Sequence, residues 1–243
     1  MRADVDGCGG GGVRVIYLTG DIHGNYDIRK LATRGLTDQA IAPSESDYLI
    51  VCGDFGLVWN KRQNSEERYW LRWLAKKPWT TLFVDGNHEN FDRLDAYPAE
   101  EWCGGLVHPV HEKVYHLMRA QVYELEGARL FTLGGARSHD MPWRKEGVSW
   151  WPRELPSDDE LRQAEAALDA CGRTVDVVVT HCAPTLVQGR IDPTFDADRL
   201  TDYLQHVRET VSFKRWFFGH YHVDRDYEDG FSALYERVVP LAL

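Results

Sequence analysis

Five short segments of this chain combine the side chains that bind divalent metals. They read Asp21-Ile22-His23, Gly53-Asp54, Gly86-Asn87-His88-Glu89, a separate His181, and Gly219-His220-Tyr221-His222. Carboxylate oxygens, amide oxygens and imidazole nitrogens are ligands that manganese, iron and zinc accept. One such segment alone is weak evidence, because similar short motifs arise by chance. Five of them in one chain, holding half of its ten histidines, favour a metal site.

Each of the five segments follows an apolar run of strand length, rich in β-branched or aromatic residues. These runs predict strands over residues 13–18, 48–52, 80–84, 175–179 and 213–218. Open α/β sheets bind their ligands at the carboxyl ends of the strands, so the loops after these strands are the predicted site.

Helix-compatible stretches alternate with the strands and predict an α/β fold. They cover residues 26–34, 65–77, 157–170 and 198–209. The third has an expected N-cap at Ser157, with Glu160 at the capping-box position.

The middle of the chain has a different pattern. Residues 114–118, 121–125 and 129–133 read as adjacent short strands of a meander, and residues 231–239 predict the last strand. Residues 134–156 form a long predicted loop rich in Trp, Arg and Gly, and loops of this length in compact domains are usually functional or disordered.

The domain organisation is expected to be simple. Five of the six residues 7–12 are glycine, which predicts a flexible leader over residues 1–12. With no internal repeat or linker in the rest, residues 13–243 are predicted to form a single domain.

The net charge of the 243-residue chain is −10, from 28 basic and 38 acidic residues. This balance disfavours a protein that coats nucleic acid or an anionic membrane by charge alone. The sequence has neither an apolar run of about 20 residues nor a recognisable signal peptide, so a cytoplasmic protein without membrane contact is expected. Its cysteines form no C-x-x-C pair, which disfavours a thiolate zinc site.

The order D-x-H, G-D, G-N-H-[ED], H and G-H-x-H resembles that of the calcineurin-like metallophosphoesterase family, over about residues 15–222. The resemblance implies a four-layer fold, in which a two-sheet β-sandwich is flanked by helices. It also implies two metals, the first held by Asp21, His23 and His222, the second by Asn87, His181 and His220, with Asp54 bridging both. His88 would stay off the metals.

The implied activity is hydrolysis of a phosphomonoester or phosphodiester, with a small phosphorylated substrate. Two divalent ions roughly 3.5–4 Å apart can share one water, lower its pKa and hold the phosphoryl oxygens. Mn²⁺ is the favoured metal, with Fe, Zn, Ni, Co and Mg as alternatives. His88 is the predicted general acid, because an imidazole can donate a proton to the leaving group.

The long loop offers candidate substrate contacts. Arg137 and Arg144 could bind phosphate oxygens, with His139 beside them, and the tryptophans of the same loop could stack on a base. The competing interpretation is a loop held by aromatic packing and surface ion pairs.

Three other functions remain open. A protein phosphatase would carry the extension G-D-x-x-D-R-G, whereas the chain reads Gly53-Asp54-Phe55-Gly56-Leu57-Val58-Trp59. A nuclease would need a basic channel, which the net charge disfavours. A non-catalytic scaffold would bind metal without turnover. The sequence does not predict the oligomeric state.

Overall fold

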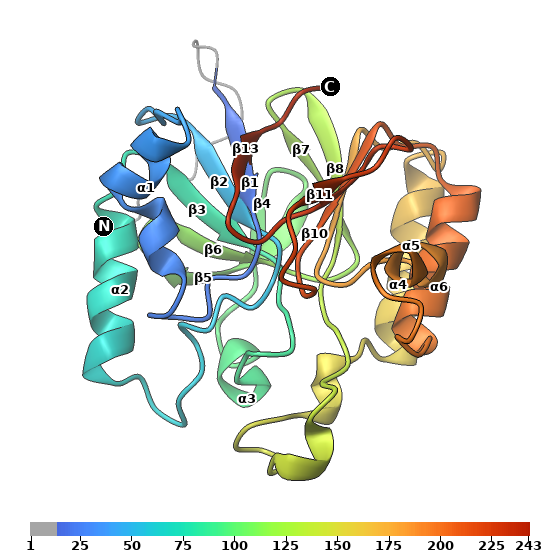
Figure 1. Ribbon diagram of the computed structural model, residues 1–243, viewed down its shortest axis with the longest axis horizontal. Coiled ribbons are helices and arrows are strands. Elements are labelled where there is room, and N and C mark those ends of the chain that lie inside the picture. Colours follow the sequence, from blue (N-terminus) through green and yellow to red (C-terminus); the bar gives the residue numbers. More distant parts are fainter. Residues whose placement is uncertain (1–13) are drawn as a thin grey trace.

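The computed structural model describes residues 14–243, so the predicted leader over residues 1–12 lies outside the described residues. Two mixed β-sheets pack face to face, with helices on their outer faces (Figure 1). This arrangement confirms the predicted α/β fold with a two-sheet sandwich flanked by helices.

The first sheet has seven strands in the order β13-β1-β2-β3-β6-β5-β4. Neighbours from β1 to β6 pair in parallel, and the other pairs are antiparallel. In sheet order the strands are Val238–Pro240, Ile16–Thr19, Tyr48–Val51, Thr80–Phe83, Val114–Leu117, Gly105–His111 and Glu100–Trp102.

The second sheet has six strands in the order β11-β12-β10-β9-β8-β7. Neighbours from β12 to β8 pair in parallel, and both edge strands are antiparallel to their neighbours. In sheet order the strands are Arg225–Asp226, Phe231–Ala233, Arg215–Phe218, Val177–Thr180, Ala128–Leu133 and Gln121–Leu125.

Helices α1 and α2 lie outside the first sheet, and α4, α5 and α6 lie outside the second (Figure 1). The α-helices are, in chain order, Thr33–Asp38, Ser65–Ala75, Phe91–Leu94, Asp158–Ala170, Thr185–Ile191 and Arg199–Thr210. Short 3₁₀ turns cover Ile28–Leu31, Met141–Trp143 and Pro152–Glu154. Across residues 14–243, no helix combines the length and the apolar character needed to cross a membrane.

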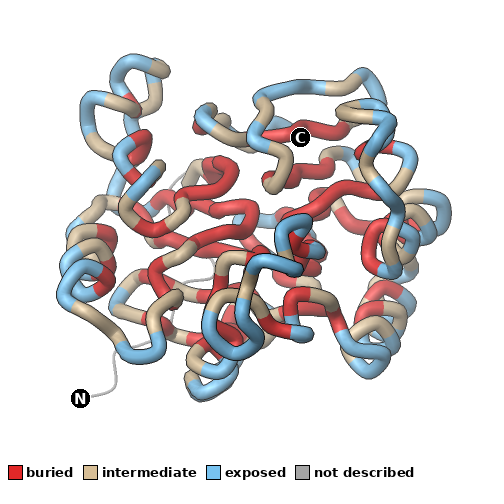
Figure 2. Tube along the Cα trace, turned by 60° about the horizontal axis from the view of Figure 1, so that its bottom comes forward, coloured by how far each residue is buried: buried red, intermediate tan, exposed pale blue. Residues whose placement is uncertain are grey.

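The central strands are buried on both faces, which explains why the sequence shows them as continuous apolar runs. In β2, Ile50 packs in the core between the two sheets, whereas Leu49 and Val51 pack with Leu71 and Leu74 of α2. Figure 2 shows buried strands through the middle of the molecule and exposed surfaces on the surrounding helices.

The structure corrects three sequence predictions. The helix expected over residues 26–34 is a 3₁₀ turn followed by α1, because Ala32 between them has an extended backbone (ψ 157°). The meander is wrong, because β6 lies in the first sheet whereas β7 and β8 lie in the second. The chain changes sheets at Ala120, which has a left-handed backbone (φ 62°).

The last strand expected over residues 231–239 is split between the sheets, with β12 in one and β13 in the other. The reason is a loop between them that turns around Asp224. Its carboxylate accepts hydrogen bonds from the backbone N–H groups of Tyr235, Glu236 and Arg237, at 2.8, 3.0 and 3.2 Å. Strands β4 and β5 and helix α5 were not predicted.

The N-terminus of α4 follows the sequence prediction. Ser157 is the N-cap, its Oγ accepts from the N–H of Glu160 at 3.2 Å, and the Glu160 carboxylate accepts from the N–H of Ser157 at 2.7 Å. The predicted capping box is therefore confirmed.

We expect Ser157→Ala to lower the free energy of unfolding by about 1 kcal/mol, because one N–H of the first turn loses its acceptor. Urea unfolding followed by circular dichroism measures this change. Ser46→Ala, at an exposed serine, is the control and should stay within about 0.5 kcal/mol of the parent. Equal stability of the two variants would contradict the capping role.

Candidate metal centre

The five predicted segments meet at one rim of the sandwich. Strands β1, β2 and β3 of the first sheet and β9 and β10 of the second each end at one of the segments. The structure therefore brings all seven predicted metal ligands together with His88. Asp21, Asp54, Asn87 and His181 are buried, whereas His222 is half-exposed.

Asp54 lies between two imidazoles. Its Oδ2 is 3.3 Å from His23 Nε2, and its Oδ1 is 3.3 Å from His181 Nε2. Oδ1 also accepts a hydrogen bond from the backbone N–H of His88 at 2.8 Å. One buried carboxylate thus connects loops from both sheets, as expected for a bridging ligand.

Asp21 faces the segment that contains the last two histidines. Its Oδ1 accepts from the backbone N–H of His220 at 3.0 Å, and its Oδ2 lies 3.1 Å from His222 Nε2. Oδ2 is buried, and within residues 14–243 no N–H or O–H group is oriented to donate to it, although His222 Nε2 lies nearby. A buried carboxylate oxygen without a hydrogen-bond donor is costly, so this atom fits a metal ligand.

Two of the imidazoles are oriented by contacts at their other nitrogen. His23 Nδ1 lies 2.7 Å from Asp27 Oδ2, and His181 Nδ1 lies 2.8 Å from the carbonyl oxygen of Cys52. Each acceptor favours a proton on Nδ1, so Nε2, which faces Asp54, is the nitrogen that can bind a metal once it has lost its own proton. Such contacts commonly orient histidines that bind metals.

Asn87 joins the same group through its amide oxygen. Its Oδ1 lies 3.3 Å from His181 Nε2, while its Nδ2 donates to Ser138 Oγ at 3.2 Å. The ring of His220 packs against that of His181, with centroids 4.9 Å apart. Asn87 and His220 thus lie beside His181, where the resemblance placed them.

The spacing of these atoms fits a metal ion. Ligand atoms about 2.1 Å from one ion are about 3.0 Å apart in octahedral and about 3.4 Å apart in tetrahedral geometry. Three groups of ligand atoms lie within 4.8 Å of one another: Asp21-His23-His222, His23-Asp54-His88 and Asp21-Asp54-His181. The second group brings His88 close to the centre, so its place off the metals stays a prediction.

The carboxylates and imidazoles of the centre shift one another's protonation. Burial alone would lower the pKa of His181 and of His23, but the charge and hydrogen bonding of Asp54 outweigh it and raise both to about 9. Burial alone would raise the pKa of Asp54, yet His181 and His23 hold it well below its usual value. Burial and the charge of His181 lower the pKa of His220 to about 3, which leaves a neutral imidazole.

The backbone at the centre is strained. Four of the seven predicted ligands have left-handed backbones, with φ of 40° at His23, 47° at Asp54, 68° at His220 and 51° at His222. Residues other than glycine rarely adopt this conformation, and it clusters at functional sites. The sequence gives no signal of it.

Glycine at 219 allows the loops to approach closely. A Cβ on Gly219 would collide with Asp21 Oδ1 and come within 2.8 Å of the carbonyl oxygen of Cys52. Glycine is therefore needed at this position because no side chain fits in the space.

Two buried ionisable side chains that are not among the predicted site residues hold these loops. Lys30 Nζ donates to the carbonyl oxygens of Asp21 at 2.7 Å and of Gly20 at 3.2 Å. Glu89 Oε1 accepts from the backbone N–H groups of Phe55 at 2.7 Å and Gly56 at 3.3 Å. Glu89 belongs to the G-N-H-E segment, whereas no sequence signal marks Lys30.

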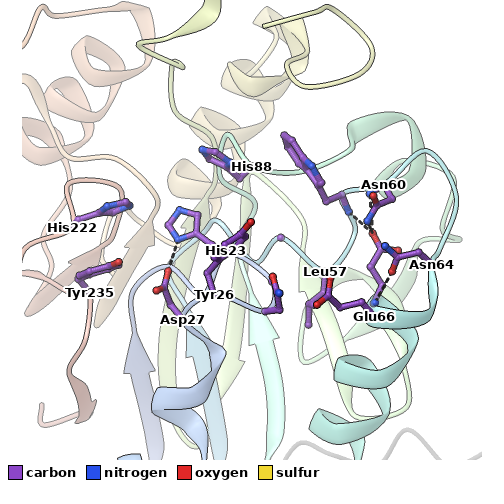
Figure 3. Close-up of a pocket in the computed structure, with 15 residues that line it drawn as sticks. His23, Tyr26, Asp27, Leu57, Asn60, Asn64, Glu66, His88, His222 and Tyr235 are labelled. Carbon is purple, nitrogen blue, oxygen red and sulfur yellow. Dashed lines mark hydrogen bonds and ion pairs between the residues drawn. The ribbon is translucent and has the colours of Figure 1, made fainter. Parts of the chain in front are cut away.

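Two pockets open beside the centre. The larger, of about 580 Å³, is lined by His23, His88 and His222 (Figure 3). The smaller, of about 240 Å³, is lined by His220 together with Arg137 and His139.

The three predicted substrate contacts do not lie together: Arg137 and His139 line the smaller pocket, whereas Arg144 lies beside His88. Arg137 is exposed, and His139 stacks on His220 with ring centroids 5.5 Å apart. Arg144 instead donates to His88 Nε2 at 3.1 Å and pairs with Asp140 at 2.6 Å. Whether any of them contacts substrate stays a prediction.

The tryptophans of the long loop do not form one stacking surface. Trp151 is buried and donates to Asp92 at 3.1 Å, whereas Trp143 is 90% exposed.

The protein is thus an α/β sandwich whose clusters of Asp and His side chains could hold metal ions. The model of the family described as calcineurin-like phosphoesterase matches residues 14–224, and the chain belongs to this family. Membership implies a hydrolase acting on phosphate esters, in a family that generally binds two divalent metals. One solved crystal structure aligns with 91% of this chain and 89% of its own chain, at 10% sequence identity and a TM-score of 0.48. No curated protein matches the chain.

The affinity of the metal-free protein for Mn²⁺ should rise with pH. At neutral pH, His23 and His181 carry protons because their pKa values are about 9, and metal ligation requires neutral imidazoles. Below about pH 9, the affinity for Mn²⁺ should rise by up to about tenfold per pH unit for each proton that metal binding releases. Calorimetric titration between about pH 6 and pH 8 measures this effect.

The same two imidazoles should make the metal-free protein less stable at high pH. Their raised pKa gives a stabilising contribution that is complete below about pH 6.5 and is lost as the pH rises through about 9. His206→Ala, at a half-exposed histidine paired with Glu165, should keep both trends. An Mn²⁺ affinity independent of pH would contradict this account.

Proposed function

We propose that this chain hydrolyses phosphate esters with two divalent metal ions bound at the strand ends. The ligands are those implied by the family pattern: Asp21, His23, Asp54, Asn87, His181, His220 and His222. The observation that supports this proposal most is the position of Asp54, buried between the Nε2 atoms of two oriented imidazoles.

The proposed metal is Mn²⁺, with Fe, Zn, Ni, Co and Mg as alternatives. A donor set of carboxylate, amide and imidazole groups suits intermediate divalent ions. When bound, two such ions supply Lewis acidity toward the phosphoryl oxygens and lower the pKa of a bound water. The protein's contribution is to fix the ligands, through the contacts of Asp27 with His23 and of the Cys52 carbonyl with His181.

His88 is the proposed general acid. Burial and the nearby charge of Arg144 outweigh Asp54 and lower the pKa of His88, so the imidazole is neutral at pH 7. Arg144 can only donate, so Nε2 of His88 accepts and the proton lies on Nδ1. As the acid, His88 would act in its protonated form, the imidazolium, which gives one proton to the oxygen of the leaving group and returns to the neutral ring.

The proposed substrate is a small phosphomonoester or phosphodiester. The smaller pocket beside His220 and the larger one beside His23 leave room for an ester substituent on either side of the centre. The proposed setting is cytoplasmic.

A panel of phosphomonoesters, phosphodiesters and cyclic nucleotides tests this function. We expect chelation to abolish turnover and Mn²⁺ to restore it. His88→Ala should lower kcat by about 10²–10⁴-fold for esters with poor leaving groups and much less for nitrophenyl esters, because a good leaving group needs no proton. Mn²⁺ content, measured on the same samples, should stay at the parent level.

His206→Ala is the matched control and should keep parental kcat on every substrate. Full turnover of the chelated protein would contradict the metal-dependent reaction. Loss of Mn²⁺ from His88→Ala would instead make His88 a ligand rather than the general acid.

A further inference from the structure

The larger pocket extends away from the metal centre along loops that the family pattern does not include. Figure 3 shows His222, His23 and His88 toward one side of it and Asn60, Asn64 and Glu66 toward the other. Its volume of about 580 Å³ lies within the roughly 300–1,000 Å³ of small-molecule sites. A substrate whose phosphate lies at the centre can therefore place its remaining part here.

The charges along this pocket disfavour a second phosphate. Neither Lys nor Arg is among its lining residues, within the part of the chain that the structure describes. The lining includes the carboxylates Asp27, Glu66 and Glu67. Asp27 lies beside His23 of the centre. Glu66 and Glu67 line the end of the pocket away from the centre, and they make that end acidic or neutral. The group that binds here should carry no further negative charge.

Two aromatic side chains that line the pocket could contribute to stacking on a ligand. The ring of Trp59 stacks on His88 with centroids 5.5 Å apart and planes at 28°. Tyr26 is 81% exposed, although it lines the pocket. An exposed aromatic ring beside a pocket suits a planar ligand, because stacking removes apolar surface of both partners from water.

Two amide side chains offer hydrogen bonds at the far end. Asn64 Oδ1 caps α2 by accepting from the N–H of Glu67 at 2.8 Å, which leaves its Nδ2 to donate. Asn60 Nδ2 donates to Glu67 Oε1 at 3.0 Å, which leaves its Oδ1 to accept. A donor and an acceptor together match the edge of a nucleobase, such as N7 and the N6 amino group of adenine.

The wall that carries Trp59 and Asn60 is held in place without a ligand. The buried carboxylate of Glu67 accepts from the backbone N–H groups of both residues, at 3.0 and 2.8 Å, and pairs with Arg93 at 2.9 Å. Asn90 donates to the carbonyl oxygen of Trp59 at 3.1 Å. A surface held from both α2 and α3 loses little entropy when a ligand binds.

We propose that this pocket binds the nucleoside part of a nucleotide that carries a single phosphoryl group. The proposal rests on the phosphoesterase function proposed above. In the reaction, the ester bond between phosphorus and the nucleoside oxygen breaks and the phosphoryl group passes to water. The nucleoside oxygen receives a proton from His88, and the products are a nucleoside and inorganic phosphate.

Three substrates test the preference on the Mn²⁺-loaded protein: AMP, ribose 5-phosphate, which lacks the base, and ATP, which carries two further phosphates. We expect kcat/KM for AMP to exceed that for each of the others by about tenfold or more. Equal values for AMP and ribose 5-phosphate would overturn the proposal.

Trp59→Ala and Tyr26→Ala test the stacking surface. Tyr26→Ala should raise KM for AMP by about tenfold and leave KM for ribose 5-phosphate unchanged, and Trp59→Ala should raise KM for AMP more than KM for ribose 5-phosphate. Tyr26→Ala is included because Trp59 also contacts His88. Trp143→Ala is the matched control, because this tryptophan is 90% exposed and lies outside the lining of the pocket. The same KM for AMP in all three variants and the parent would overturn the proposal.

Adenosine, which has no phosphate, separates the pocket from the reaction. Saturation-transfer NMR should detect adenosine on the parent protein and on Trp143→Ala, and much less on Trp59→Ala. Adenosine binding without turnover of any ester would refute the proposed function and support the pocket assignment. Turnover of esters without adenosine binding would support the proposed function and refute the assignment of the pocket.

Discussion

A buried negative charge, the carboxylate of Asp54, is the constraint on which the rest of the site depends. It lies between the Nε2 atoms of His23 and His181 and accepts the backbone N–H of His88. A charge removed from water must be compensated nearby, or it becomes very costly. In the metal-free protein, the protonated imidazoles provide that compensation. Divalent ions would provide it when bound, which couples metal binding to proton release and to stability.

The loops around this carboxylate are held by contacts that do not themselves belong to the centre. Lys30 holds the backbone at Asp21, in the loop after β1. Glu89, in the loop after β3, holds the backbone at Phe55 in the loop after β2. Glu67 extends the same arrangement to the wall of the larger pocket. These buried side chains hold the backbone close to the residues that have left-handed conformations. The centre and the pocket are therefore shaped by one continuous set of contacts.

The sequence predicted the strand ends well, because parallel strands buried on both faces give continuous apolar runs that end at polar residues. It also predicted the helix beginning at Ser157, since a capping box is a local pattern. It failed where tertiary contacts decide, as at the loop around Asp224 that splits the last strand. It left open whether the Arg- and Trp-rich loop forms a substrate wall; Arg137 and His139 of that loop line the smaller pocket, whereas the larger pocket is lined by other loops. Arg144 turns to His88 instead, and no local pattern predicts this pairing.

The most direct test of the account is the number of metal ions that one chain binds. Native mass spectrometry after loading with Mn²⁺ should find two ions on the parent protein. It should find at most one on Asp54→Ala, because the proposed bridging carboxylate serves both ions. A single ion or none on the parent protein, or two ions retained by Asp54→Ala, would contradict the two-metal centre.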